Sequence, residues 1–75
     1  MNKQQLKNRL IAENIRPDAY CLDGGLPSEK LCFNEVNDKW EIYYSERGEK
    51  TGLKVFDNEE KACQYFYDEL IDMIA

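Results

Sequence analysis

The stretch that decides the fold is KWEIYYSERGEKTGLKVF, residues 39–56. Its first seven residues alternate between apolar and polar side chains, which is the pattern of a β-strand with one buried face. The side chains expected to face inward are Trp40, Ile42 and Tyr44, and those expected to face outward are Lys39, Glu41 and Tyr43. Leu53 and Val55 are expected to point inward from a second strand over residues 53–56, so the stretch predicts two neighbouring strands.

The segment between these strands, SERGEKTG at residues 45–52, raises the question of a phosphate-binding loop. Such a loop has the spacing GxxxxGK[ST] and opens a helix whose N-terminus meets the phosphates. Here Gly48 precedes Lys50 by two residues, a strand is expected to follow, and two glutamates would repel a phosphate. We therefore expect an exposed hairpin connection in which glycine supplies a positive φ, and we expect no cofactor.

More strands are expected before this hairpin. Residues 30–36 alternate, and the polar pair Asn37-Asp38 marks a turn between them and residue 39. Residues 18–22 predict a short strand with Tyr20 and Leu22 on one face. Residues 23–28 are dense in turn formers and predict a loop.

A helix is expected at each end of the chain. Residues 3–14 carry a narrow apolar stripe and stop before Pro17, because the residue before a proline is pushed toward extended geometry. A second helix is expected from Asp57 or Asn58, with glutamates in its first turn, where the helix dipole favours anions. Its apolar stripe is broad enough to lie on a sheet and consists of Ala62, Cys63, Phe66, Tyr67, Leu70, Ile71 and Ile74.

These elements predict one α+β domain over residues 1–75. We expect two layers, with an antiparallel sheet of three to four strands covered on one face by the N-terminal and C-terminal helices, in the order α-β-β-β-β-α. The uncovered sheet face is expected to show Glu41, Tyr43, Asn34 and Lys54, with Cys32 and Phe56 near its edges. A tyrosine among acids on an open sheet is suited to a protein interface, although an ordinary solvated sheet face has the same pattern.

The charge distribution favours a basic partner. The net charge is −5, and residues 1–16 contribute four bases and one acid, so residues 17–75 hold six bases against 14 acids. An acidic body repels nucleic-acid phosphates and attracts basic proteins, although it also serves solubility alone. The basic residues of the first helix leave nucleic-acid binding as an alternative function. It is the weaker alternative because this helix has no aromatic residues on which nucleobases could stack.

No residue pattern predicts catalysis or metal binding. The chain has no histidine, which removes the commonest general base and the commonest metal ligand. The three cysteines, Cys21, Cys32 and Cys63, have no CxxC spacing, so free and mostly buried thiols are expected. No apolar run is long enough for a bilayer span or a signal peptide, so a cytoplasmic protein without membrane contact is expected.

Residues 39–70 resemble the small bacterial immunity proteins of polymorphic toxin systems, including those of contact-dependent growth inhibition. The resemblance is carried by WEIYYSERG at residues 40–48 and by FDNEEKACQYF at residues 56–66, and YCLDGG at residues 20–25 also fits. These motifs consist mainly of inward aromatic residues, a glycine loop and an amphipathic helix. They therefore support family membership better than they identify contact residues.

The resemblance implies a non-enzymatic inhibitor that forms a one-to-one heterodimer with a cognate toxin domain and blocks its active site or its substrate access. Such toxins are often nucleases with basic clefts, which an acidic inhibitor matches. Exposure and charge give the candidate contacts Glu41, Tyr43, Glu46, Arg47, Glu49, Asp23 and Glu29, with Tyr43 as the apolar anchor. The alternative is a small acidic regulatory or adaptor module that binds another protein.

Overall fold

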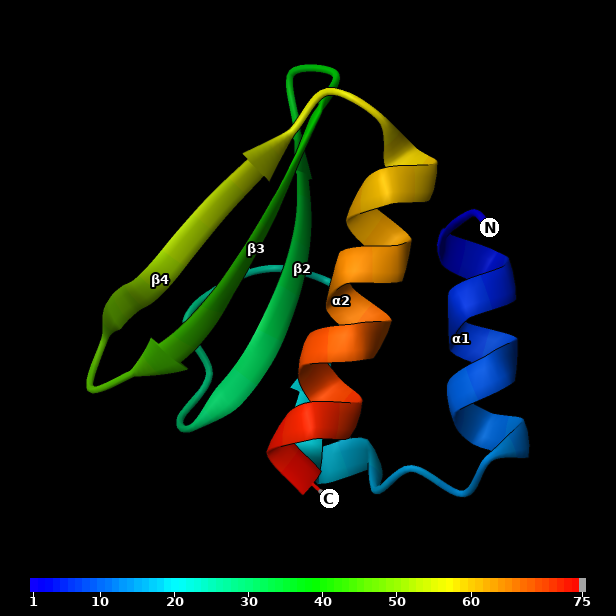
Figure 1. The fold of residues 1–75 in the computed structure, drawn as a ribbon. Helices are drawn as coiled ribbons and strands as arrows, with labels where there is room; N and C mark the ends of the chain where they lie inside the picture. Colours follow the sequence, from blue (N-terminus) through cyan, green and yellow to red (C-terminus); the bar gives the residue numbers. More distant parts are fainter. Residues whose placement is uncertain (75) are drawn as a thin grey trace.

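The computed structural model describes residues 1–74 and confirms an α+β fold with the element order α1-β1-β2-β3-β4-α2 (Figure 1). The helices are α1 (Lys3–Ala12) and α2 (Glu59–Ile74), and a short 3-10 helix covers Pro17–Ala19. The strands are β1 (Tyr20–Cys21), β2 (Lys30–Val36), β3 (Lys39–Glu46) and β4 (Glu49–Phe56).

Helix α1 begins at a capping box. The Asn2 side chain accepts a hydrogen bond from the Gln5 backbone, and the Gln5 side chain accepts one from the Asn2 backbone. These reciprocal bonds satisfy two of the donors that every helix N-terminus leaves unpaired. Asn14, with a positive φ of 57°, follows the end of the helix and leads to Pro17.

The four strands form one sheet in the order β1-β2-β3-β4, but the sheet is mixed. The two pairs β2–β3 and β3–β4 are antiparallel, whereas β1 runs parallel to β2. The expectation of an all-antiparallel sheet is therefore wrong at β1. Parallel neighbours require a connection that returns to the start of the next strand. Residues 22–29, which include the simple loop expected over residues 23–28, make that return.

Both hairpin turns are two residues long. Asn37 and Asp38 have φ values of 49° and 62°, and Arg47 and Gly48 have values of 52° and 76°. Positive φ at both central residues matches the right-handed twist of the flanking strands, as in a type I′ turn. Most of SERGEKTG is therefore strand, because β3 extends to Glu46 and β4 begins at Glu49. The connection between the strands is shorter than the sequence predicted.

The core lies between the sheet and the helices, which lie on the same side of the sheet (Figure 1). Helix α2 contacts β2, β3 and β4, and α1 packs against α2. Phe66 is at the centre of this cluster, with edge-to-face ring contacts to Phe33 at 5.8 Å and to Tyr20 at 6.5 Å. The fully buried Leu6 and Leu10 carry α1 into the same core.

Strand β4 presents the opposite faces from those expected. Its register places Val55 beside Glu41 and Lys54 beside Ile42, and an irregularity lies between Ile42 and Tyr44. Because side chains alternate between the two faces, a shift of one residue moves each side chain to the other face. Leu53 and Val55 are thus 44% and 56% exposed and do not face the core. On the helix side, the ring of Phe56 packs against Tyr65.

Residues 22–29 cover part of the sheet face that the sequence predicted to be open. The Gly24 amide donates to the Phe33 carbonyl at 3.2 Å, so the segment lies directly against β2. A Cβ atom at Gly24 would lie 2.3 Å from Asn34 Oδ1, and the residue has a φ of 70°. Only glycine fits both the close approach and this backbone conformation.

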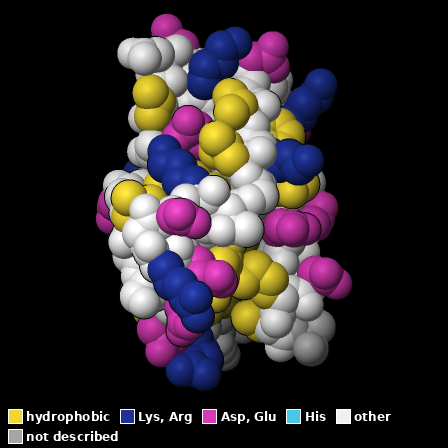
Figure 2. All heavy atoms as spheres, turned by 90° about the vertical axis from the view of Figure 1, so that its left-hand side faces the viewer, with side chains coloured by type: hydrophobic (Ala, Val, Ile, Leu, Met, Phe, Trp, Pro, Cys, Tyr) yellow, Lys and Arg dark blue, Asp and Glu magenta, His cyan; other side chains and the backbone are white. Residues whose placement is uncertain are grey.

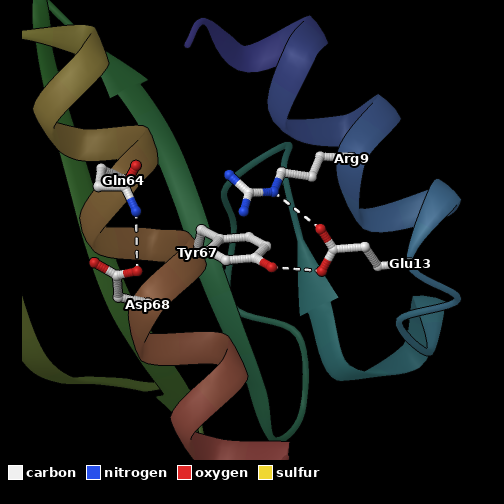
Figure 3. A network of polar contacts seen from close by, with 5 residues as sticks. All are labelled: Arg9, Glu13, Gln64, Tyr67 and Asp68. Carbon is white, nitrogen blue, oxygen red and sulfur yellow. Dashed lines mark hydrogen bonds and ion pairs between the residues drawn. The ribbon is translucent and has the colours of Figure 1, made fainter.

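A polar network on the surface joins the two helices (Figure 3). The Tyr67 hydroxyl on α2 donates to the carboxylate of Glu13, and Arg9 Nε donates to the same carboxylate at 2.9 Å. The Arg9 guanidinium also lies 3.8 Å from the centroid of the Tyr67 ring. The hydroxyl and then the guanidinium lower the pKa of Glu13, so the carboxylate that links the helices is favoured in its charged form.

Candidate partner-binding surface

The tip of the β3–β4 hairpin carries two glutamates that face one another. The register pairs Glu46 with Glu49 across the turn formed by Arg47 and Gly48, and all four residues are exposed. Among residues 1–74, none of these three charged side chains makes an ion pair within 4.0 Å. Like charges directly opposite each other on neighbouring strands destabilise the pair. The fold therefore leaves a local excess of negative charge at this tip.

Glu29 lies at the same end of the sheet. Lys30 pairs with Ser45, so the residue before it comes next to the end of β3. Glu29 is exposed and has a φ of 54°. We call Glu29, Glu46, Arg47 and Glu49 the acidic hairpin end. The structure thus brings together four of the seven residues predicted from the sequence as contacts with a partner.

Glu41 is held within the protein. Its carboxylate accepts hydrogen bonds from Lys50 Nζ at 3.1 Å and from Asn34 Nδ2 at 3.4 Å, and its side chain is 19% exposed. Lys50 also lies 4.7 Å from the centroid of the Tyr43 ring. Because Lys50 already neutralises its charge, Glu41 should attract a cationic partner more weakly than the acidic hairpin end does.

Tyr43, expected as an exposed anchor, is 1% exposed. It does lie on the sheet face away from the helices, but residues 22–29 cover it, and its hydroxyl donates to the Gly25 carbonyl at 2.6 Å. Burial, followed by the nearby Cys32 thiol and the Glu41 carboxylate, raises the pKa of Tyr43 to about 12. The expected exposure was wrong because no residue pattern indicates where residues 22–29 cross the sheet. Tyr43 is a packing residue.

Asp23 lies away from the other candidates. It is exposed, and its carboxylate is 3.6 Å from Lys3 Nζ on α1. It lines a cavity between α1 and β1 together with residues of both elements. An interface centred on the β3–β4 hairpin would therefore leave Asp23 outside.

An apolar groove of about 290 Å³ lies between the hairpin and α2. Tyr44 and Thr51 line it from the strands, and Tyr65, Glu69 and Met73 line it from the helix. We call this the hairpin groove. Met73 is 46% exposed, and burial and then Glu69 raise the pKa of Tyr65. This groove was not predicted from the sequence: the expected inward face of β3 includes Tyr44, but the expected stripe of α2 includes none of the helix residues that line the groove.

The surface on the side of β4 is mixed in character. Figure 2 views the molecule from this side and shows several hydrophobic patches separated by basic and acidic side chains. Val36, Leu53 and Val55 are the exposed large apolar residues of the strands. Scattered apolar residues of this kind are normal on protein surfaces, so we assign them no role.

Other kinds of site find little support in the described residues. Within residues 1–74, no three Cys, Asp or Glu side chains are grouped so as to hold a metal ion. Neither α1 nor α2 has the length and apolar character of a helix that crosses a membrane. Comparisons with protein-family models, with curated proteins and with solved structures found no match to this chain.

Proposed function

We propose that the chain is a non-catalytic immunity protein that binds and neutralises a cognate bacterial toxin domain in the cytoplasm. The observation that carries the proposal is the acidic hairpin end, where Glu46 and Glu49 face one another without an ion-pair partner in residues 1–74. A cationic surface placed against this tip would relieve the repulsion between the two carboxylates. The resemblance of residues 39–70 to immunity proteins supports a toxin domain as the partner.

The hairpin groove supplies an apolar anchor next to this charge. Interfaces gain most of their affinity from a few well-buried contacts surrounded by polar residues. The rings of Tyr44 and Tyr65 and the flexible side chain of Met73 can enclose one apolar side chain of the partner. In this proposal the groove, and not the buried Tyr43, is the apolar anchor of the interface.

The acidic hairpin end would act mainly on the rate of association. A toxin domain with a basic, phosphate-binding cleft would be attracted to the exposed carboxylates before the groove engages. Once bound in a one-to-one complex, the inhibitor would cover the cleft and exclude the substrate. A nuclease is the toxin class that this charge complementarity fits best.

The direct test is co-expression with a toxin domain encoded immediately upstream of this chain's gene. Cells that produce the toxin domain alone should stop growing, and cells that also produce this chain should grow. Death of the co-expressing cells, with both proteins confirmed as soluble, would contradict the proposal. Protection without a complex detectable by size-exclusion chromatography would contradict direct binding.

A further inference from the structure

Two of the three cysteines are direct neighbours in the sheet. The parallel pair β1–β2 aligns Cys21 with Cys32, on the sheet face that also carries Tyr43. Neighbouring strands lie about 4.8 Å apart, and a disulfide needs a Cα separation of roughly 4.4–6.8 Å. The strands thus hold these two residues at a spacing at which a disulfide can form. Cys63 is buried on α2, on the other side of the sheet, within the main core.

The two aligned thiols differ in access. Cys21 is half-buried, its Sγ donates to the Gly24 carbonyl at 3.3 Å, and it lines a cavity of about 540 Å³. Cys32 is fully buried. Burial, and then the neighbouring Cys21 thiol, raise the pKa of Cys32 to about 11. Cys21 is thus the more accessible of the two aligned thiols, and the fully buried Cys32 is placed to react with a group already attached to its neighbour Cys21.

The cavity that opens onto Cys21 has a basic lining in an acidic protein. Lys3, Lys7 and Lys30 line it together with a single acid, Asp23, whereas the whole chain has a net charge of −5. Asp23 pairs with Lys3, and neither of the other two lysines makes an ion pair within residues 1–74. Reactive cysteines occupy electropositive and partly exposed surroundings of this kind.

We propose that Cys21 and Cys32 are a redox-active pair that closes to a disulfide when an anionic disulfide, such as oxidised glutathione, enters the lysine-lined cavity. The Cys21 thiolate attacks one glutathione sulfur, forms a mixed disulfide and releases one glutathione thiolate. The Cys32 thiolate then attacks the Cys21 sulfur and releases the second glutathione. The two protein thiols are oxidised by two electrons, one glutathione disulfide is reduced to two glutathione thiols, and the two protons pass to these products.

The closed pair would tie β1 to β2 and close a loop over residues 22–31, which includes the segment that covers Tyr43. Cross-linking a loop removes conformational freedom from the unfolded chain, so the oxidised protein should melt at a higher temperature. The proposal is independent of the toxin partner, and it can be tested on the isolated protein.

The first experiment maps the thiols of the native protein after incubation with excess oxidised glutathione. Trypsin cleaves after Lys30, between Cys21 and Cys32, and after Lys61, before Cys63, so each linkage gives a different pair of peptides. We expect one linkage, Cys21 to Cys32, with the loss of two hydrogen atoms and a free Cys63. Three free thiols in the native protein, under conditions where the urea-unfolded protein reacts, would overturn the proposal. A linkage that includes Cys63 would also overturn it.

The second experiment separates the two roles. The variant Cys32→Ser should accumulate the mixed disulfide at Cys21, because the second step is blocked, whereas the matched variant Cys63→Ser should react as the wild type does. Equal labelling of Cys21 and Cys63 in the first variant would contradict the assigned order. If Cys32→Ser does not fold, the wild type is quenched with acid during the reaction: a trapped glutathione adduct on Cys21 supports the assigned order, and one on Cys32 contradicts it.

The third experiment tests the lysines. Lys7→Gln should slow the reaction with oxidised glutathione several-fold and leave the reaction with uncharged hydroxyethyl disulfide unchanged, because only the first reagent carries carboxylates. Lys61→Gln, which removes an exposed lysine on α2, is the matched control and should change neither rate. Equal rates for Lys7→Gln and the wild type with both reagents would show that the basic lining plays no part.

Discussion

The variant Tyr43→Phe tests how much the buried hydroxyl of Tyr43 contributes to holding residues 22–29 on the sheet. The hydroxyl donates to the Gly25 carbonyl at 2.6 Å, and the ring is 1% exposed, so the substitution removes the bond and keeps the packing. A neutral hydrogen bond of this kind contributes about 0.5–1.5 kcal/mol net. Gly25 is exposed, so water can replace the lost partner. We therefore expect a loss of about 1 kcal/mol, near the middle of that range.

For a domain of this size, about 1 kcal/mol corresponds to a fall of roughly 4–8 °C in the melting temperature. Urea denaturation should give a lower midpoint with an unchanged slope, because the surface exposed on unfolding is the same. Tyr44→Phe is the matched control, since Tyr44 is only half-buried and its hydroxyl makes no hydrogen bond within residues 1–74. Equal midpoints for Tyr43→Phe and the wild type would refute the role given to this bond.

Three further predictions concern the close approach of Gly24, the link between the helices and the hairpin groove. Gly24→Ala should destabilise the protein by more than the roughly 1–2 kcal/mol expected from its left-handed backbone alone, because the added Cβ also clashes with Asn34. In the control Gly48→Ala, a Cβ meets no atom within 4 Å, so only the backbone cost should appear. Equal urea midpoints for the two variants would contradict the clash with Asn34. Folding lowers the pKa of Glu13 below 4.5, so the charged carboxylate stabilises the protein above that pH, and this stabilisation is lost as the pH falls through the lowered pKa. The urea midpoint of Glu13→Gln should therefore fall less steeply in acid than that of the wild type. Parallel pH profiles of the two midpoints would contradict the role given to Glu13. Met73→Asp should weaken binding of the toxin domain, measured by calorimetry, far more than the control Ile74→Asp. Met73 is 46% exposed and lines the hairpin groove, whereas Ile74 is 45% exposed and lies outside it. Equal losses of affinity would show that the groove is not part of the interface.

The alternating and helical patterns allowed most of the fold to be predicted. Strand β2 and the Asn37-Asp38 turn lie where the alternation placed them, and α2 buries the core of its expected stripe. These features are local, because side-chain period and turn chemistry act over a few residues. The parallel direction of β1 was not predictable in this way, since it depends on the path of residues 22–29 in three dimensions.

The candidate site was predicted less completely for the same reason. The exposed tip of the β3–β4 hairpin follows from turn chemistry and charge, and Glu46, Arg47 and Glu49 do lie there. The faces of β4 were inverted because the pairing irregularity beside Tyr44 changes the alternation, and no residue pattern signals it. Burial of Tyr43 depends on a covering segment that is distant in sequence.

The central claim is that the acidic hairpin end draws a basic toxin domain to this protein. The most direct measurement is the association rate of the toxin domain as a function of salt, for Glu46→Gln/Glu49→Gln and for Glu35→Gln/Asp38→Asn. Both double variants remove two negative charges, and the second removes them at the opposite end of the β2–β3 pair. We predict that the first variant associates several-fold more slowly and with a weaker dependence on salt, while the second matches the wild type. Equal rates for the two variants would contradict the claim.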